Sequence, residues 1–511
     1  MIKFQTPSNS QTDTPFKLGQ PAVQGPDEIG IPATVELERD LIIASKSALG
    51  PASLSLQADA AEAGQLILNT CLLPERDEPY TLTLELARNR IMRCLAKQEE
   101  WAMFDIRPTH PAAIKLATAQ KHFVEALSNS DDPELCEQHA HKALIAAIDA
   151  SEELTLTHAN GLLKRRWRYG QLDGNIFGIG VDPRLDPTIS TIDDTLTANF
   201  NYVRLPMTWR SIEPEETKFK WDRLDAWTEW AQDKRIPIVG GPLVDFSPSS
   251  VPDWLYIWEH DHETLTQLIK EHIERLVTRY RGSVSLWNVA SGLHVNENFP
   301  LNFEQIMDLT RTASTLTRKV HPTGRTMIEI TQPFGEYYAS NPRSIPPLMF
   351  AEMTLQSGIP FDALGIRLIT GYPQKGHRTR DLMQISAMLD RFNALGKPLH
   401  ITAVAAPSQP VDQMPQPASM PGQDPKPQEA NPAPAGHWRN PWSQDHQALW
   451  LEAVMRVALS KPYVESAAWL DLVDHDQSLA PYSGLLDADL KPRYALKKLT
   501  ALRRSFEDYD E

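Results

Sequence analysis

Short apolar runs alternate with longer amphipathic stretches from residue 176 towards the end of the chain. Runs of this length are typical of strands, and a stretch such as 264–280 has its apolar residues at helical spacing. Strands that alternate with helices form a parallel sheet, and eight repeats predict a sheet closed as a TIM (β/α)8 barrel. Functional residues are then expected at the carboxyl ends of the strands. The eight predicted strands are 176–181, 202–205, 237–244, 284–289, 326–331, 363–369, 399–404 and 467–472.

The first 171 residues have a different pattern. Short apolar runs predict strands at 33–37, 41–44, 54–56 and 66–72, whereas 80–103, 111–128 and 133–166 have the length and apolar spacing of helices. The barrel is therefore preceded by a smaller β-rich plus helical N-terminal region. The predicted organisation is a β-rich module over 1–105, a helical connector over 106–171 and the barrel over 172–505.

A proline-rich insertion is predicted over 407–441, which contains ten prolines in 35 residues. Proline lacks the backbone N–H that helices and sheets use, so this segment is not expected to form regular structure. It directly follows the seventh predicted strand and therefore projects over the barrel mouth. A lid and a tolerated surface insertion fit the composition equally well. Trp438 lies near its end, where its ring would either stack on a sugar or anchor the returning chain.

The composition narrows the possible partners. The 511 residues carry a formal net charge of −16 at pH 7, which disfavours a nucleic-acid partner because phosphate backbones are anionic. No apolar stretch is long enough to span a membrane, and residues 1–5 lack an apolar signal region. These features predict a soluble, cytoplasmic protein. No phosphate-binding glycine loop is present, and Cys71, Cys94 and Cys136 give no disulfide framework, so no cofactor is predicted.

Several segments in a fixed order carry a resemblance to a known family. Residues 200–209 read Phe-Asn-Tyr-Val-Arg-Leu-Pro-Met-Thr-Trp, residues 285–292 read Ser-Leu-Trp-Asn-Val-Ala-Ser-Gly, and residues 398–405 read Pro-Leu-His-Ile-Thr-Ala-Val-Ala. Together with 240–246 and 361–366, these segments resemble barrel strands of glycoside hydrolase family 10, the endo-1,4-beta-xylanase family. The resemblance covers 172–505 and implies a TIM barrel with a carbohydrate ligand.

The same resemblance places the family's two catalytic glutamates at positions where this chain has none. The acid/base position falls on Gly292 and the nucleophile position on Ala403. The resemblance therefore implies a family-10-like protein that binds a glycan or oligosaccharide at the barrel mouth without the standard retaining xylanase reaction. Positions that bind sugar in the family are also changed, and they hold Pro206, Gly241, Asp245, Phe246, Arg367 and Ile369.

An active hydrolase with relocated carboxylates is the alternative. Retaining glycosidases need two carboxyl groups about 5 Å apart, one with a raised pKa and one ionised. Glu297, Glu329 and Asp245 are the candidate substitutes. Glu329 also fits a salt bridge inside the barrel with Arg367 or Arg204. Five residues are expected to contact the substrate: Asn288, Trp209, Arg367, Trp438 and Trp469.

The histidines near the predicted barrel mouth do not indicate a metal site. Four histidines lie in or after strands four, seven and eight, namely His294, His400, His437 and His475. No closely spaced motif such as His-Glu-x-x-His joins them, so no metal is predicted.

A β-rich region before a glycosidase barrel is either a carbohydrate-binding module or a structural cap on the barrel's flank. The long apolar helices of this region favour the cap.

Overall fold

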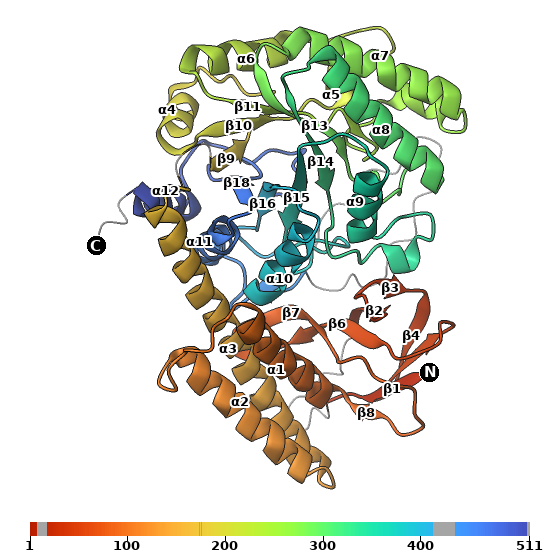
Figure 1. Cartoon of the computed structure of the whole chain (residues 1–511), viewed down its shortest axis with the longest axis vertical. Helices are drawn as coiled ribbons and strands as arrows, with labels where there is room; N and C mark the ends of the chain where they lie inside the picture. Colours follow the sequence, from red (N-terminus) through yellow and green to blue (C-terminus); the bar gives the residue numbers. More distant parts are fainter. Residues whose placement is uncertain (8–17, 173, 175, 412–434, 508–511) are drawn as a thin grey trace.

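The computed structural model describes residues 1–7, 18–172, 174, 176–411 and 435–507, and these form two regions packed side by side (Figure 1). The larger region is a closed parallel barrel ringed by helices. The smaller one, which contains the N-terminus, combines short sheets with three helices. The predicted fold class, a TIM barrel preceded by a β-rich and helical region, is confirmed.

The barrel has eight strand positions, and the eighth strand pairs with the first to close it. All pairings are parallel, and the third position is shared by two short strands, β11 and β12. β15 and β16 are buried along almost their whole length, as expected where helices cover the sheet and side chains fill the barrel. The strands are β9 (Phe177–Gly180), β10 (Tyr202–Leu205), β11 (Ile238–Gly240) with β12 (Val244–Asp245), β13 (Val284–Ser291), β14 (Arg325–Ile330), β15 (Ala363–Ile369), β16 (Leu399–Ala405) and β18 (Val464–Trp469).

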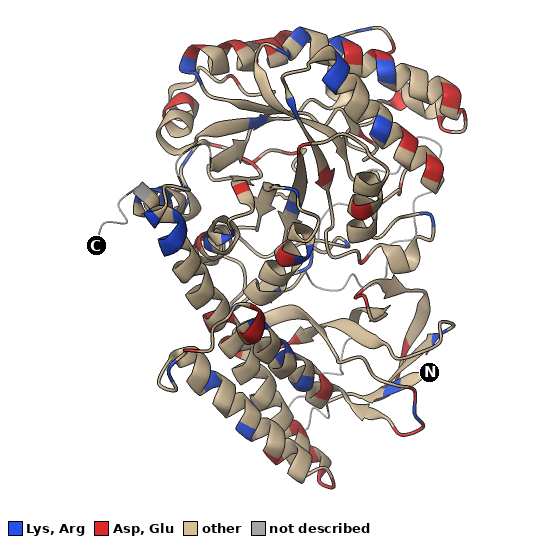
Figure 2. Ribbon diagram, in the orientation of Figure 1, with Lys and Arg blue, Asp and Glu red and all other residues tan. Residues whose placement is uncertain are grey.

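Amphipathic helices cover the outside of this barrel. Several begin at side chains that cap the first turn, such as Asn302 before α8 and Asp381 before α10. In both cases the backbone N–H of the capping residue donates to a glutamine side chain, which completes the capping box. Basic and acidic residues are interspersed on the outer helices (Figure 2). The helices are α4 (Ser190–Asn199), α5 (Trp209–Ile212), α6 (Asp222–Lys234), α7 (His262–Tyr280), α8 (Phe303–Val320), α9 (Pro347–Gln356), α10 (Leu382–Asn393), α11 (Gln444–Ser460) and α12 (Tyr494–Glu507).

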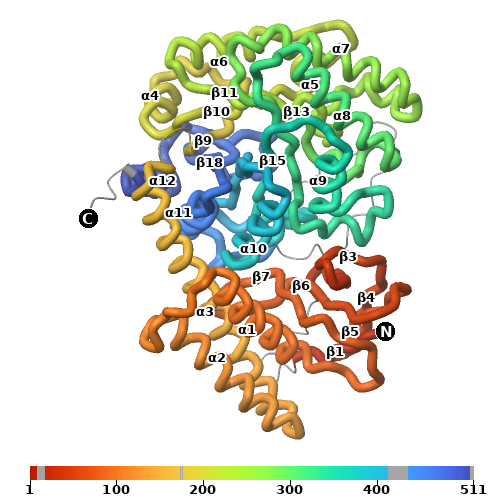
Figure 3. Tube along the Cα trace, viewed as in Figure 1, coloured from red at the N-terminus to blue at the C-terminus, as the bar shows by residue number. Residues whose placement is uncertain are grey.

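The N-terminal region contains two small sheets. One has the order β4-β5-β1-β8, formed by Ala33–Glu38, Leu41–Lys46, Ile2–Gln5 and Tyr80–Thr81. The other has the order β17-β7-β6-β2-β3, formed by His437–Trp438, Gly64–Asn69, Ser53–Asp59, Gly19–Gln24 and Gly30–Ile31. Three helices follow in sequence: α1 (Leu82–Glu100), α2 (Pro111–Ser128) and α3 (Pro133–Arg168). α2 and α3 form a hairpin whose turn lies far from the barrel, and α3 runs back to reach it (Figure 3).

Buried polar contacts join the two regions. Arg90 of α1 donates two hydrogen bonds, of 3.0 and 2.5 Å, to the carboxylate of Asp381 before α10. Arg166 of α3 donates to the backbone carbonyl oxygens of Leu459 and Val464 beside the start of β18. Charge-assisted bonds of this kind are strong because burial excludes competing water. The N-terminal region is therefore held against the α10–α11 flank of the barrel.

Most of the predicted proline-rich insertion, 412–434, lies outside the described residues. At its described end, β17 pairs antiparallel with β7 of the N-terminal region. Trp438 is buried there, and its indole N–H donates to Glu152 of α3 at 2.6 Å. Arg439 forms ion pairs with Asp149 and Glu152. These contacts match the anchoring role considered for this cluster. No helix within the described ranges is long and apolar enough to cross a membrane.

Candidate functional site

A cavity of about 640 Å³ opens at the carboxyl ends of β9, β10, β11, β12, β15 and β18. Its size falls within the range of small-ligand pockets, and its place is the one that barrels use for binding and chemistry. Many charged and hydroxyl side chains line its wall. They include Asp182, Arg184, Arg204, Arg210, Asp245, Ser247, Ser250, Arg367, Asp471, His475 and Ser478.

Glu329, in β14, organises the floor of this cavity from beneath. It is fully buried, and its carboxylate accepts hydrogen bonds from Arg367 at 2.5 Å, Ser291 at 2.6 Å and Asn288 at 3.1 Å, and from Thr402. Burial alone would raise the pKa of Glu329, but these arginine charges and hydroxyl donors outweigh it and lower the pKa to about 2. The predicted salt bridge inside the barrel is confirmed.

Arg204, in β10, is the second cation beside Glu329. Its guanidinium lies 3.8 Å from the carboxylate and lines the cavity. Burial lowers the pKa of Arg204, and the neighbouring Glu329 opposes that shift. Arg204 donates no hydrogen bond to any described residue. Because a guanidinium has five N–H donors, Arg204 retains donors that a ligand in the cavity can use.

Asp245 ends β12 and stands on the cavity wall. It accepts hydrogen bonds from the Ser247 backbone N–H at 2.8 Å, the Ser247 hydroxyl at 3.0 Å and the Ser250 hydroxyl at 2.8 Å. Burial raises the pKa of Asp245 more than Arg367 and these bonds lower it. Asp245 and Glu329 therefore have pKa values shifted in opposite directions, with Arg367 acting on both.

Gly292 and Ala403, where the resemblance leads us to expect the family's glutamates, have different surroundings. Gly292 adopts the left-handed backbone conformation, with φ of +64°, and a Cβ atom there would lie 2.8 Å from the Thr331 hydroxyl oxygen. Ala403 is fully buried in an apolar cluster with Tyr372, Val411 and Leu470, among others. A glutamate at Gly292 would be strained by this backbone conformation, and one at Ala403 would have to enter the apolar cluster.

The remaining predicted site residues do not line this cavity, except Arg367. Glu297 is exposed on the loop after β13. Trp209 is buried, stacks on His272 and donates to Glu213 at 2.9 Å. Trp469 is buried and donates to the Ser483 carbonyl at 2.7 Å. Asn288 donates a hydrogen bond to Glu329, and Trp438 lies at the junction with the N-terminal region.

The histidines considered in the sequence make separate contacts. His294 is buried and lies 2.9 Å from the Thr331 carbonyl, whereas His400 lies 2.7 Å from the Ser466 hydroxyl. His475 contacts Asp471 and Arg184 on the cavity wall. Burial lowers the pKa of His475, but the charge and hydrogen bond of Asp471 outweigh it and the net shift is upward. Among the described residues, metal-type donors gather closely only at a different place, on α2 and α3.

Sequence reasoning missed part of the cavity wall. Asp182 and Arg184 come directly after β9 and form an ion pair of 2.7 Å, yet neither is among the predicted site residues. Ser247 and Ser250, which hold Asp245, were also missed. A signal was present in the sequence, because residues just after a barrel strand line the mouth.

These features define the molecule as a (β/α)8-barrel protein whose candidate site lies at the usual end of the barrel. Residues 170–419 match the family model for glycosyl hydrolase family 10. This part of the chain is therefore similar to glycosyl hydrolase family 10.

Individual relatives are distant. The chain is 25% identical to endo-1,4-beta-xylanase C of Paenibacillus barcinonensis over 279 residues, 49% of this chain and 24% of that protein. It is 31% identical to endo-1,4-beta-xylanase 3 of Hypocrea jecorina over 93 residues, 18% of this chain and 24% of that protein. The matched stretches thus span about a quarter of each relative's length. The structure of xylanase 10B from Thermotoga petrophila with xylobiose aligns with a TM-score of 0.47 and 16% identity, covering 67% of this chain and 97% of that one.

Proposed function

We propose that this protein binds a glycan or oligosaccharide at the barrel mouth and does not perform the standard retaining hydrolysis of its family. The observation that carries the proposal is the pair Gly292 and Ala403, which stand where the family's glutamates are expected. Retaining hydrolysis needs one carboxylic acid and one carboxylate about 5–5.5 Å apart. A glycine in the left-handed conformation and an alanine packed among apolar side chains supply neither group.

The cavity favours a sugar that carries a carboxylate, such as a uronic acid unit. Arg204 and Arg367 both lie beside the Glu329 carboxylate, but only Arg367 donates hydrogen bonds to it. Arginine pairs with carboxylates through two parallel hydrogen bonds, and Arg204 has the donors available for such a pair. Ser247 and Ser250 nearby offer hydroxyl groups of the kind that meet sugar hydroxyls.

A calorimetric titration tests this proposal directly. Xylo-oligosaccharides that carry a glucuronic acid branch are expected to bind, and the unbranched oligosaccharides of equal length are expected to bind more weakly. Arg204→Gln is expected to weaken binding of the acidic oligosaccharide at least about tenfold, because one charge-assisted contact contributes about 1.5–3 kcal/mol. Arg343→Gln, at an exposed arginine outside the cavity, is the matched control. Equal affinity for the two sugars, or an unaffected Arg204→Gln variant, contradicts the acidic-sugar assignment.

A hydrolase that uses Asp245 and Glu329 is the second candidate. Their opposite pKa shifts are the pattern of an acid and a nucleophile. Two observations argue against this candidate. Glu329 is 0% exposed, and its carboxylate oxygens already accept hydrogen bonds from four residues. Asp245 pairs in register with Ser291, and Ser291 with Glu329, so the backbones of the two acids are two strands apart, about 10 Å. Sugar release that Asp245→Asn abolishes would establish this second function.

The N-terminal region is proposed to be a structural cap, with the β-rich module over 1–105 and the connector over 106–171. Its support is the buried Arg90–Asp381 pair and the arginine contacts at the start of β18, which tie it to the barrel. A cap of this kind is expected to unfold together with the barrel. Two separate unfolding transitions in a thermal scan would contradict it.

A further inference from the structure

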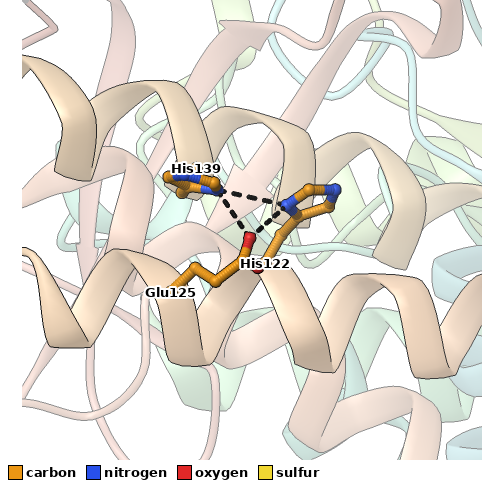
Figure 4. A group of neighbouring side chains, drawn as sticks. All are labelled: His122, Glu125 and His139. Carbon is orange, nitrogen blue, oxygen red and sulfur yellow. Dashed lines mark hydrogen bonds and ion pairs between the residues drawn. The ribbon is translucent and has the colours of Figure 1, made fainter.

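Two histidines and a glutamate meet near the turn of the α2–α3 hairpin (Figure 4). His122 and Glu125 are three residues apart on α2 and therefore share a face of the helix. His139 reaches them from the second turn of α3, across the 129–132 link. All three side chains are partly exposed, at 23%, 36% and 19%. The site is at the end of the hairpin far from the barrel mouth.

The three side chains aim one donor atom each at a common point. Nδ1 of His122 lies 3.0 Å and Nδ1 of His139 lies 2.9 Å from the same Glu125 oxygen, Oε2. The two Nδ1 atoms are 3.2 Å apart. The other oxygen, Oε1, lies 4.0 Å from the Lys121 ammonium. Oε2 is therefore directed to the histidines and Oε1 to the lysine.

This triangle has the dimensions of three ligands on one metal ion. Zinc holds imidazole nitrogen at about 2.0–2.1 Å and carboxylate oxygen at about 2.0–2.2 Å, so its tetrahedral ligand atoms are about 3.3–3.5 Å apart. The observed separations are shorter by only a few tenths of an ångström. An ion about 1 Å above the plane of the three atoms would be about 2 Å from each. A water molecule would supply the fourth ligand of a tetrahedral ion.

Hydrogen bonding alone satisfies the three groups less well. If both Nδ1 atoms carry protons, two N–H groups converge on a single oxygen with their nitrogens 3.2 Å apart. If only one carries a proton, the other nitrogen directs its lone pair at the carboxylate oxygen 3.0 Å away or less. A cation removes this conflict, because neutral imidazoles and a carboxylate all present lone pairs to it.

We propose that His122, Glu125 and His139 form a binding site for a divalent transition-metal ion of the zinc type. Two histidines and one carboxylate, with a water in the fourth position, are a familiar zinc ligand set. Apart from Lys121, a small apolar cluster occupies this part of the hairpin, made of Leu84, Phe123, Ala126, Cys136 and Ala140. The ion would therefore clamp α2 to α3 at an end of the hairpin with a small apolar core.

Metal titration of the untagged full chain, stripped with a chelator, tests the site. Cobalt(II) is the probe, since its visible absorption reports tetrahedral nitrogen and oxygen ligation, and zinc is then used to displace it. One cobalt per chain is expected, with an unfolding temperature that rises on metal addition. His139→Ala and Glu125→Gln are expected to weaken cobalt binding at least about tenfold. Glu125→Gln retains a hydrogen-bond acceptor for the histidines, so its metal-free unfolding temperature is expected to equal that of the wild type.

His141→Ala is the matched control, because His141 lies two residues further along α3 and outside the cluster. Its cobalt affinity is expected to equal that of the wild type. The proposal is overturned if the stripped chain takes up no cobalt, or if the bound cobalt lacks the tetrahedral spectrum. Loss of binding in His141→Ala to the same degree as in His139→Ala would equally overturn it.

Discussion

The two halves of the barrel mouth differ in the side chains that lie beyond the strand ends. At the ends of β9, β10, β12 and β18 the mouth is open, and its wall carries charged and hydroxyl side chains. At the ends of β13 and β16 it is filled: Gly292 lies against Thr331, and Ala403 is packed among apolar side chains. Between them, Glu329 of β14 is saturated with hydrogen bonds.

The open half of the mouth has the features needed to bind a ligand, whereas the filled half lacks the groups needed to cleave one. The open half keeps hydrogen-bond donors and a cavity, which are the requirements of recognition. The filled half contains the two positions where a family 10 barrel is expected to place its reacting carboxylates. Since retaining hydrolysis needs both carboxylates facing the sugar, this contrast supports the proposal that the barrel binds a glycan without cleaving it.

The largest effect is expected from Glu329→Ala, which removes the charge between the two halves. It leaves the guanidinium groups of Arg367 and Arg204 close together without their carboxylate. Breaking a buried ion pair in this way costs about 3–5 kcal/mol of unfolding free energy. Urea denaturation measures the loss. Glu297→Ala, at an exposed position, is the control and should stay within about 0.5 kcal/mol of the wild type. A loss below about 1 kcal/mol for Glu329→Ala would show that Glu329 does not organise the floor.

Ala403→Glu tests whether the filled half can be reopened. The added carboxylate would enter a cluster with Tyr372, Val411 and Leu470, where it finds apolar neighbours. Overpacking a core costs about 1–3 kcal/mol, and an unpaired buried charge adds to that cost. The variant should therefore be destabilised by at least about 2 kcal/mol and gain no sugar release, even when combined with Gly292→Glu. A stable double variant that hydrolyses xylan would show that the filled half is not closed to catalysis.

The acid dependence of stability sharpens the same comparison. Because the pKa of Glu329 is about 2, below its ordinary value of 4.5, the ionised form stabilises the fold. That contribution is complete above about pH 4.5 and is lost as the pH falls towards 2. Wild type should therefore lose about 3 kcal/mol relative to Glu329→Gln across this window. Parallel denaturation curves at several pH values measure it, and a difference that stays constant with pH would contradict the assignment.

Much of the fold was accessible from the sequence because local patterns encode it. The run 363–369 coincides with β15, and the range 111–128 coincides with α2. The apolar pattern alone indicates β15, since a barrel strand is buried by helices on its outer face and by barrel side chains on its inner face. The N-terminal runs around 54–56 and 66–72 likewise became β6 and β7, which pair antiparallel.

The candidate site could be predicted only in part from the sequence, because it depends on the register between distant strands. The salt bridge of Glu329 was foreseen, since Arg204, Glu329 and Arg367 all lie in predicted strands. The hairpin cluster was not, because His139 becomes a neighbour of His122 only when α2 and α3 pack. Trp438 was expected to contact substrate, but its side chain is buried against Glu152. That burial depends on the pairing of β17 with β7, which local sequence patterns do not predict.

Reducing-end release and binding, measured on the same samples of glucuronic-acid-bearing xylo-oligosaccharides, distinguish a barrel that only binds from one that cleaves. We expect saturable binding that Arg204→Gln weakens, together with no sugar release above that of the buffer. Release at a steady rate by the wild type, lost in Asp245→Asn, would contradict it and show that the mouth cleaves the sugar that it holds.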